Sequence, residues 1–302
     1  MTPGARALLA AVGRTPLVRL SRLDADVEGV ELWAKLEQHN PGGSVKDRPV
    51  VQMLADAEAD GRLRAGAALI ESSSGNTGIA LALHGVARGY EVAVVMPESV
   101  PRARHRRLLE LGATVIDSDG AAGSDGAIRL VRERVLREPG RYCYLDQYSS
   151  LSNPLAHERT TGPELLAALG PRLTHFVAGL GTTGTTVGTG RCLRRFLPSI
   201  EIVGVKPDQA AHGLVGLKHL ATSIVPAVFA PDVLSRRVSV STGDGLAMVE
   251  RVARDEGLAV GPSSGANIAA AYRLAQRLCA RGRAGVIAII VCDDASRYGE
   301  EA

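Results

Sequence analysis

The sequence predicts an α/β protein with two lobes, each built around a largely parallel sheet. Short apolar runs alternate with longer helical patterns along most of the chain, which is typical of βαβ units. A polar segment, 147–154, interrupts this alternation and is the best candidate for a crossing between lobes. Ligands of such sheets bind beyond the carboxyl ends of the strands, so we expect a functional cleft between the lobes.

The expected strands and helices alternate along the chain on both sides of this segment. Apolar runs of strand length lie at 67–70, 91–95, 114–116, 175–178, 202–205 and 286–291. Helical patterns lie at 50–58, 78–88, 102–111, 127–137, 187–196 and 267–280. The basic run 102–107 could bind an acidic partner, but it is more typical of a solvated helix face.

Length and composition fit a globular protein and argue against several functions. The 302 residues are 45% hydrophobic and 22% charged, within the globular range. A net charge of +3 is too balanced for a nucleic-acid footprint, and 3% aromatic residues leave few platforms for stacked bases. No stretch approaches the roughly 18 apolar residues of a membrane span. We therefore expect neither nucleic acid nor a membrane as partner.

The cysteine pattern predicts reduced thiols and a cytoplasmic location. The four cysteines are far apart, with no C-x-x-C pair and no secretory signal at the N-terminus. His212 and His219 lack acidic or cysteine companions, so no metal site is expected.

Four polar, glycine-rich turns are expected where strands end and helices begin, and they are the candidate functional sites. These turns are 40–48, 71–78, 179–188 and 260–266. The first contains Lys46, at a helix start whose positive potential favours the neutral, nucleophilic form of an amine. An isolated lysine beside a turn is usually a surface residue, but the neighbouring Gly-Gly pair suggests a close approach of the backbone.

The second and third turns both offer donors to an anion. The serines, Asn76 and backbone N–H groups of the second suit a carboxylate, and they are more numerous than helix capping requires. The third contains G-x-G-x-x-G, which indicates either a dinucleotide site or a cup for one phosphate. A nicotinamide oxidoreductase would need an acidic residue after the next strand, where Lys206 stands, and four threonines favour the cup. The fourth turn alone predicts only that Ser263 begins a helix.

Together, in this order and spacing, the turns resemble the cysteine synthase branch, cysteine synthase B-like, of the fold-type II pyridoxal-phosphate (PLP) enzymes. The resemblance extends from Gly13-Arg-Thr-Pro-Leu-Val to Ser296-Arg-Tyr. It implies a two-lobed fold like that of the tryptophan synthase β subunit, with parallel-rich sheets and the active site in the interlobe cleft. The implied lobes are a smaller mobile lobe over 37–149 and a larger cofactor-phosphate-binding lobe over 13–36 plus 150–302.

The resemblance also implies a role for each matched residue. Lys46 matches the catalytic lysine that forms a Schiff base with PLP, and Ser263 matches the partner of the pyridine nitrogen. Asn76 matches a residue that contacts both cofactor and substrate. The implied phosphate cup consists of Gly181, Thr182, Thr183, Gly184 and Thr185. The other implied substrate-binding residues are Ser73, Ser74, Gly75, Thr77, Gln147 and Lys218.

The implied reaction is a β-replacement that makes L-cysteine from O-acetyl-L-serine or O-phospho-L-serine and a sulfur donor, through an aminoacrylate intermediate. The neutral hydroxyl of Ser263 suits elimination better than transamination, because it does not hold the pyridine nitrogen fully protonated. Relatives that prefer O-phosphoserine carry an arginine where this chain has Lys218; the alternative is a solvated lysine beside a mobile loop. The implied partners are the small-molecule amino-acid substrate, the sulfur donor and a second copy in a cytoplasmic homodimer.

Four departures from the family pattern and several alternatives remain. Ser73 replaces a threonine and Thr183 a glycine, and both keep hydrogen-bonding groups. Lys206 replaces a glutamate and Cys292 a proline, which leaves the substrate preference open. Cystathionine β-synthase, diaminopropionate synthase and serine dehydratase chemistry stay open on the same scaffold. A noncatalytic ligand-binding or complex-forming paralogue is the alternative from another class.

Overall fold

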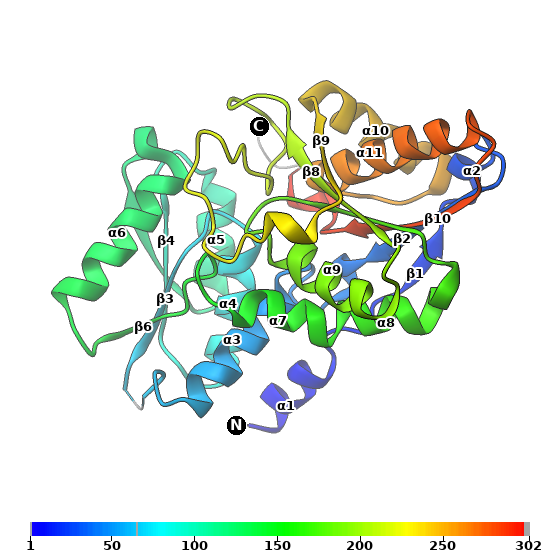
Figure 1. Cartoon of the computed structure of the whole chain (residues 1–302). Coiled ribbons are helices and arrows are strands. Elements are labelled where there is room, and N and C mark those ends of the chain that lie inside the picture. Colours follow the sequence, from blue (N-terminus) through cyan, green and yellow to red (C-terminus); the bar gives the residue numbers. More distant parts are fainter. Residues whose placement is uncertain (1, 65, 299–302) are drawn as a thin grey trace. The chain divides into compact units, whose positions relative to one another are not determined.

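The computed structural model describes residues 2–64 and 66–298, which form two compact units. Among the described residues, the first unit consists of 2–12 and 40–153, and the second consists of 13–39 and 154–298. Each unit has its own sheet with helices packed on it (Figure 1). The predicted α/β class with parallel-rich sheets is confirmed.

The first unit is built on a four-stranded, fully parallel sheet in the order β5-β4-β3-β6. Its strands are β3 (Ala68–Ser72), β4 (Val92–Pro97), β5 (Thr114–Ser118) and β6 (Tyr142–Tyr144). Its helices are α1 (Pro3–Ala10), α3 (Asp47–Ala59), α4 (Asn76–Ala87), α5 (Arg102–Glu110) and α6 (Gly123–Arg137). Helix α7 (Ser152–Arg159) begins at the boundary with the second unit.

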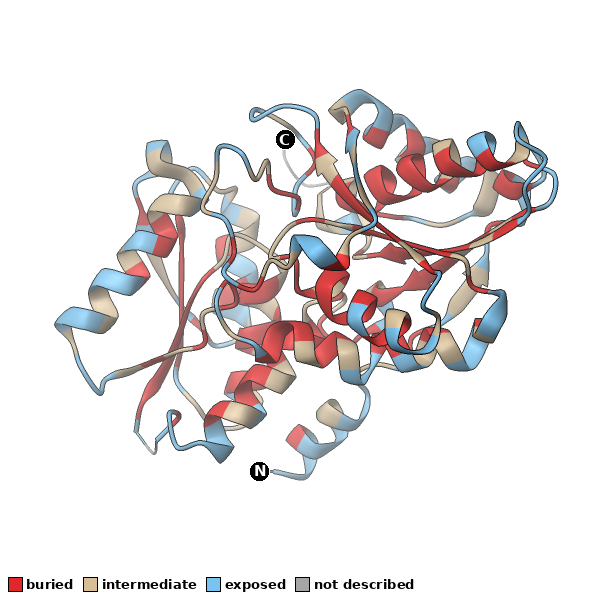
Figure 2. Cartoon of the chain, viewed as in Figure 1, coloured by how far each residue is buried: buried red, intermediate tan, exposed pale blue. Residues whose placement is uncertain are grey.

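Two apolar clusters, one on each face of this sheet, hold the first unit together. On one face, Met53 of α3, Leu81 of α4 and Leu108 of α5 pack in one buried cluster with strand residues. On the other face, Ala127 and Val131 of α6 belong to a separate cluster. Strands β3 and β4 are buried along their whole length, as Figure 2 shows, because helices cover both faces.

The second unit is built on a six-stranded sheet in the order β1-β2-β10-β7-β8-β9. Its strands are β1 (Leu17–Arg19), β2 (Val30–Leu36), β7 (His175–Gly179), β8 (Glu201–Pro207), β9 (Arg236–Val240) and β10 (Gly285–Val291). Its other helices are α2 (Ser21–Asp24), α8 (Thr161–Leu169), α9 (Gly184–Phe196), α10 (Thr242–Glu256) and α11 (Pro262–Cys279). Only the edge pair β1–β2 is antiparallel among the described strands. Helices α10 and α11 lie on one side of the sheet and α8 and α9 on the other (Figure 1).

Strands β1 and β2 were not expected from the sequence, because polar residues interrupt their apolar pattern. Lys35 of β2 is nevertheless 3% exposed. Its ammonium donates to the Thr15 carbonyl at 2.5 Å and pairs with Glu164 at 2.6 Å. A charge is tolerated in a buried strand when it is paired and hydrogen-bonded in this way.

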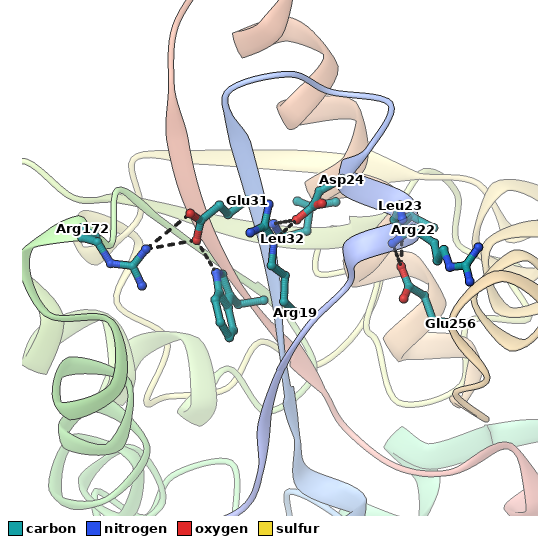
Figure 3. Close-up of polar contacts among 9 residues, drawn as sticks. Arg19, Arg22, Leu23, Asp24, Glu31, Leu32, Arg172 and Glu256 are labelled. Carbon is teal, nitrogen blue, oxygen red and sulfur yellow. Dashed lines mark hydrogen bonds and ion pairs between the residues drawn. The ribbon is translucent and has the colours of Figure 1, made fainter.

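Carboxylates also fix the connection between β1 and β2, as Figure 3 shows. The buried Asp24 carboxylate accepts from Arg19 Nε at 2.7 Å and from the Leu32 amide at 3.2 Å. Glu256, at the end of α10, accepts from the Arg22 and Leu23 amides at 2.9 and 2.8 Å and so caps the start of α2. The short helix α2 is therefore held by side chains distant in sequence, which local patterns do not reveal.

In the described part of the chain, no helix has the length and apolar character needed to cross a membrane. Within the same residues, no group of three or more His, Cys, Asp or Glu side chains is arranged to hold a metal ion.

Candidate active site

The structure places two of the four glycine-rich turns directly between a strand and a helix. The turn after β3 leads into α4, and the turn after β7 leads into α9. The first turn is separated from β2 by the 3-10 helix Glu37–His39. The expectation was wrong for the fourth turn, which follows helix α10. There the Gly261 amide donates to the Asp293 carbonyl at 3.1 Å, so the chain before α11 is fixed without joining the sheet.

Lys46 immediately precedes the first residue of α3, one position before the helical turn expected for it. Its neighbour Asp47 is fully buried, and Asp47 Oδ1 accepts from the Gly42 amide at 2.7 Å. His84 Nε2 of α4 lies 2.8 Å from the same oxygen. A Cβ on Gly42 would lie 2.6 Å from that oxygen, so the expected close approach at the Gly-Gly pair is to Asp47. These contacts hold the backbone that carries Lys46, whose side chain is half-buried.

The Ser73–Asn76 loop, the predicted carboxylate-binding loop, connects β3 to α4. Its four residues are half-buried. Ser73 Oγ accepts from the Gly75 and Gly78 amides at 3.2 and 2.9 Å, so this hydroxyl shapes the loop. Nothing lies within 4 Å of a Cβ built on Gly75, so the loop has open space on that side among the described residues.

Gln147 lies against both ends of the Ser73–Asn76 loop. Thr77 Oγ1 donates to Gln147 Oε1 at 2.8 Å, and Gln147 Nε2 donates to the Ser72 carbonyl at 3.0 Å. Asn153 Nδ2 donates to the Gln147 carbonyl at 2.6 Å. The structure therefore brings together two predicted site residues, Thr77 and Gln147, that are 70 positions apart in the sequence.

The basic run on α5 is not simply a solvated face, contrary to the sequence interpretation. Arg104 Nη1 donates to the Ser74 carbonyl at 3.3 Å and so contacts the Ser73–Asn76 loop. His105 is 7% exposed, and its Nε2 lies 2.9 Å from Asp117 Oδ1. Arg104 and His105 therefore contact other parts of the unit, whereas Arg102, Arg106 and Arg107 are exposed.

The predicted phosphate cup, 181–185, lies at the start of α9 in the second unit. Thr183 has φ +68°, in the left-handed region that is costly for a β-branched residue. Its side chain is buried, and Thr183 Oγ1 has no hydrogen-bond partner among the described residues. Thr185 Oγ1 is 3.2 Å from His157 Nε2. A helix N-terminus with an unpaired buried hydroxyl is a suitable site for an anion.

The segment 214–218 packs directly on this cup. The Lys218 amide donates to the Leu180 carbonyl at 2.8 Å, and a Cβ on Gly181 would overlap the Gly216 carbonyl oxygen. Lys218 is 8% exposed, so the alternative of a solvated lysine is wrong. A Cβ on Gly216 would lie 3.5 Å from Ser263 Oγ. The second unit thus gathers three sequence-distant parts of the predicted site: the cup, Lys218 and Ser263.

Ser263 is in the first turn of α11 and is 4% exposed. One turn further along, Asn267 Nδ2 donates to the Ile290 carbonyl at 2.9 Å and lies 3.8 Å from Cys292 Sγ. The Cys292 amide donates to Ser264 Oγ at 2.8 Å. Cys292 is therefore a neighbour of the Ser263 helix turn, and none of the four cysteines forms a disulfide within the described residues.

Several residues that shape these turns were not predicted as site residues from the sequence. Asp47 had a recognisable signal, since a carboxylate is favoured at a helix N-terminus. His84 had none, because a histidine inside an apolar helix is not distinguishable by pattern from other buried positions. Glu71 is 1% exposed, and its carboxyl accepts from the Ser72 and Gln147 amides at 2.8 and 3.1 Å. Burial raises the pKa of Glu71 to about 8.

Comparison with known proteins identifies the family of this chain. Residues 8–293 match the family model described as "Pyridoxal-phosphate dependent enzyme". A cysteine synthase of Aquifex aeolicus is 44% identical over 293 residues, covering 96% of this chain and 90% of that protein. Cysteine synthase B of Escherichia coli is 38% identical over 287 residues, covering 95% and 92%.

A solved structure gives the same result for the fold. The crystal structure of a cysteine synthase (OASS) from Entamoeba histolytica superposes with a TM-score of 0.91 at 31% identity. The match covers 97% of this chain and 89% of that one. Family, fold and near-complete coverage coincide, and the chain therefore belongs to the pyridoxal-phosphate dependent enzymes, on their cysteine synthase branch.

Proposed function

We propose that this protein is a PLP-dependent cysteine synthase that replaces the β-substituent of O-acetyl-L-serine or O-phospho-L-serine with sulfur. The observation that carries the proposal is the anion site at the start of α9. There the buried Thr183 hydroxyl has no hydrogen-bond partner among the described residues. Cysteine synthases that are 44% and 38% identical to this chain support the same reaction. A cytoplasmic location, a homodimeric state and a mobile smaller lobe over 37–149 are further parts of the proposal.

The residues present fit PLP. Its phosphate requires several donors and no nearby carboxylate, and the 181–185 turn offers threonine hydroxyls and backbone amides at a helix N-terminus. The unpaired Thr183 Oγ1 provides a donor that no described protein group uses. We assign the phosphate to Gly181–Thr185, the pyridine nitrogen to Ser263 and the covalent attachment to Lys46.

Bound PLP supplies an electron sink that makes the Cα proton of an amino acid acidic. Lys46 would provide the amine that holds the cofactor and, when that amine is free, would accept the Cα proton. We assign the substrate carboxylate to the Ser73–Asn76 loop, which consists of Ser73, Ser74, Gly75 and Asn76, together with Thr77 and Gln147. The hydroxyl of Ser263 donates or accepts a hydrogen bond without the negative charge of a carboxylate, which favours loss of the β-substituent over transamination.

The test is formation of cysteine by the purified protein. We expect L-cysteine from O-acetyl-L-serine or O-phospho-L-serine with sulfide, and no product after PLP is removed with an amine reagent and the protein is dialysed. Readdition of PLP should restore the rate. A protein that binds PLP but forms no cysteine from either ester would contradict the proposed reaction and leave the family assignment standing.

Thr183→Gly should change stability and cofactor affinity in opposite directions. Removal of a β-branched residue at φ +68° should stabilise the apoprotein by about 1 kcal/mol. Loss of a charge-assisted hydrogen bond to phosphate should weaken PLP binding roughly tenfold or more. Thermal unfolding of the apoprotein and equilibrium dialysis with PLP measure the two effects.

Thr183→Ser is the matched control for this prediction. It keeps the hydroxyl, so its affinity for PLP should stay within about threefold of the original. Equal affinities of the glycine and serine variants would mean that Thr183 Oγ1 does not contact the phosphate.

Lys218→Ala should lower kcat/KM for O-phosphoserine by roughly ten- to a hundredfold, with a much smaller loss for O-acetylserine. The reason is that an ammonium facing a phosphate ester contributes a charge-assisted bond that a neutral acetyl ester lacks. Both esters should be compared with sulfide at fixed ionic strength.

Lys206→Ala is the control, because Lys206 is a half-buried lysine of the same unit, at the end of β8. Equal losses for both esters, together with weaker PLP binding, would instead assign Lys218 to the cup on which its backbone packs.

A further inference from the structure

Strands β3 and β6 separate at the point where the Ser73–Asn76 loop begins. Their parallel ladder ends at the pair Ile70 and Tyr144. Two residues beyond Tyr144, Asp146 has φ +47°, so the chain after β6 turns sharply. Beyond this pair, no main-chain hydrogen bonds of the ladder join the end of β3 to the segment after β6. Some other group must hold the two chains together there.

The buried carboxyl of Glu71 connects the two separated chains. One oxygen, Oε1, accepts from the Ser72 amide at 2.8 Å, and the other, Oε2, accepts from the Gln147 amide at 3.1 Å. Ser72 Oγ lies 3.4 Å from Oε1. Glu71 therefore fixes the first residue before the loop and the backbone of Gln147 at the same time.

Gln147 extends this connection to the far end of the loop. Because Thr77 Oγ1 donates to its Oε1, the amide orientation is set, and its Nε2 faces the Ser72 carbonyl at 3.0 Å. The Nε2 group has a second N–H beyond the one used by Ser72. Glu71, Ser72, Gln147 and Thr77 thus close a ring across the neck of the loop, which we call the clasp.

We propose that Glu71 is a positioning residue for the substrate carboxylate, which acts through the clasp by fixing Gln147 and the width of the Ser73–Asn76 loop. This inference rests on the proposed function, because that function assigns the substrate carboxylate to this loop. Glu71 itself does not touch the substrate in this account.

The charge state of Glu71 fits such a role. Burial raises its pKa to about 8, and the nearby Asp146 carboxylate adds to the increase. Other titratable groups in this region include the phenols of Tyr144 and Tyr148, whose pKa values are also raised by burial. Asp125 acts on Tyr148, and Arg132 lies 3.8 Å from Asp146. The raised pKa favours the protonated carboxyl at neutral pH, so Glu71 adds no negative charge of its own beneath a loop that receives a carboxylate. Ionisation above pH 8 adds that charge and should weaken carboxylate binding.

The test is to compare amino-acid binding with sulfide use in the holoenzyme carrying Glu71→Gln. The new amide has one acceptor, so its NH₂ group must face one of the two backbone N–H donors and half of the clasp is lost. At pH 7 we expect the Kd for L-alanine, followed by the visible absorbance of bound PLP, to rise about tenfold. The KM for sulfide, which has no carboxylate, should change less than twofold. At pH 9 the L-alanine Kd of the variant should exceed that of the original protein by a smaller factor than at pH 7. The reason is that Glu71 ionises and weakens binding in the original protein, whereas glutamine does not ionise.

Glu98→Gln is the matched control, since Glu98 follows the neighbouring strand β4 and accepts from the Gly120 amide at the long distance of 3.4 Å. It should leave both constants unchanged. If Glu71→Gln does not fold, Glu71→Asp replaces it, because the shorter side chain cannot reach both amides. We then expect at least a threefold rise in the L-alanine Kd with an unchanged sulfide KM.

An L-alanine Kd within twofold of the original at pH 7, an equal rise in the sulfide KM, or a Kd ratio that is constant between pH 7 and pH 9 would overturn the proposal. A protein that binds L-alanine as expected but makes no cysteine would refute the proposed function and leave the clasp intact. The two failures are therefore distinguishable.

Discussion

Lys46→Ala should lower the rate of cysteine formation by at least about a thousandfold while the protein remains folded. Removal of the amine eliminates both the covalent attachment of PLP and the base for the Cα proton, and each contributes by orders of magnitude. The fold should survive, because the local backbone is held by Asp47 through the Gly42 amide and His84, not by the Lys46 side chain. Steady-state assays with excess PLP, together with thermal unfolding, measure the two outcomes.

Lys46→Arg tests whether the positive charge of Lys46 is sufficient for activity without a deprotonatable amine. The guanidinium keeps the positive charge but is not deprotonated in proteins, so this variant should be as inactive as the alanine variant. Lys206→Ala controls for the loss of a half-buried lysine elsewhere and should retain activity. Turnover by either Lys46 variant within tenfold of the original would mean that another residue is the catalytic amine.

Gly188→Ala should have the largest effect on stability. Gly188 is in α9, and a Cβ there would overlap the Pro154 carbonyl oxygen of α7 and lie 2.7 Å from its carbon. These are backbone atoms, so α7 and α9 must move apart, at a cost of about 3 kcal/mol or more. For a chain of this size we expect Tm to fall by roughly 6 to 12 °C. Since α9 begins at the cup, PLP affinity should fall as well.

Gly243→Ala is the matched control in the same unit. Gly243 is exposed in the first turn of α10, and the nearest atom to a new Cβ would be Ser241 Oγ at 4.0 Å. This change should leave Tm unchanged or raise it slightly, because alanine has the better helix propensity. If the two glycine variants unfold at the same temperature, the close contact between α7 and α9 does not exist in solution.

The sequence predicted the buried strands, whose apolar pattern is continuous, and several of the helices between them. The strands expected at 91–95 and 286–291 are present as β4 and β10, and the helices expected at 102–111 and 187–196 are present as α5 and α9. These strands are buried on both faces, so a run of Ala, Val and Ile is sufficient to identify them. Strand β2 escaped prediction because Lys35 is buried by an ion pair with a residue 129 positions away, which no local pattern contains.

The turns of the proposed site could be recognised in the sequence, but the hydrogen bonds that hold them could not. Glycines, hydroxyls and Lys46 mark the turns, because their chemistry depends on residue type. The clasp and the Asp47–His84 contact join residues 37 to 76 positions apart through single hydrogen bonds, so only the fold reveals them. Likewise, Thr183 in place of the usual glycine keeps a hydrogen-bonding group in the sequence. The conformational strain of a β-branched residue there is visible only in its positive φ angle.

Borohydride reduction of the purified protein after incubation with PLP, followed by mass mapping of peptides, tests directly whether Lys46 binds the cofactor covalently. Reduction makes the bond between PLP and its lysine permanent. We expect visible absorbance that is lost on reduction, and a mass increase equal to one reduced PLP on the peptide that contains Lys46. Colourless protein that takes up no PLP, or a label on Lys35, Lys206 or Lys218 in place of Lys46, would contradict this assignment.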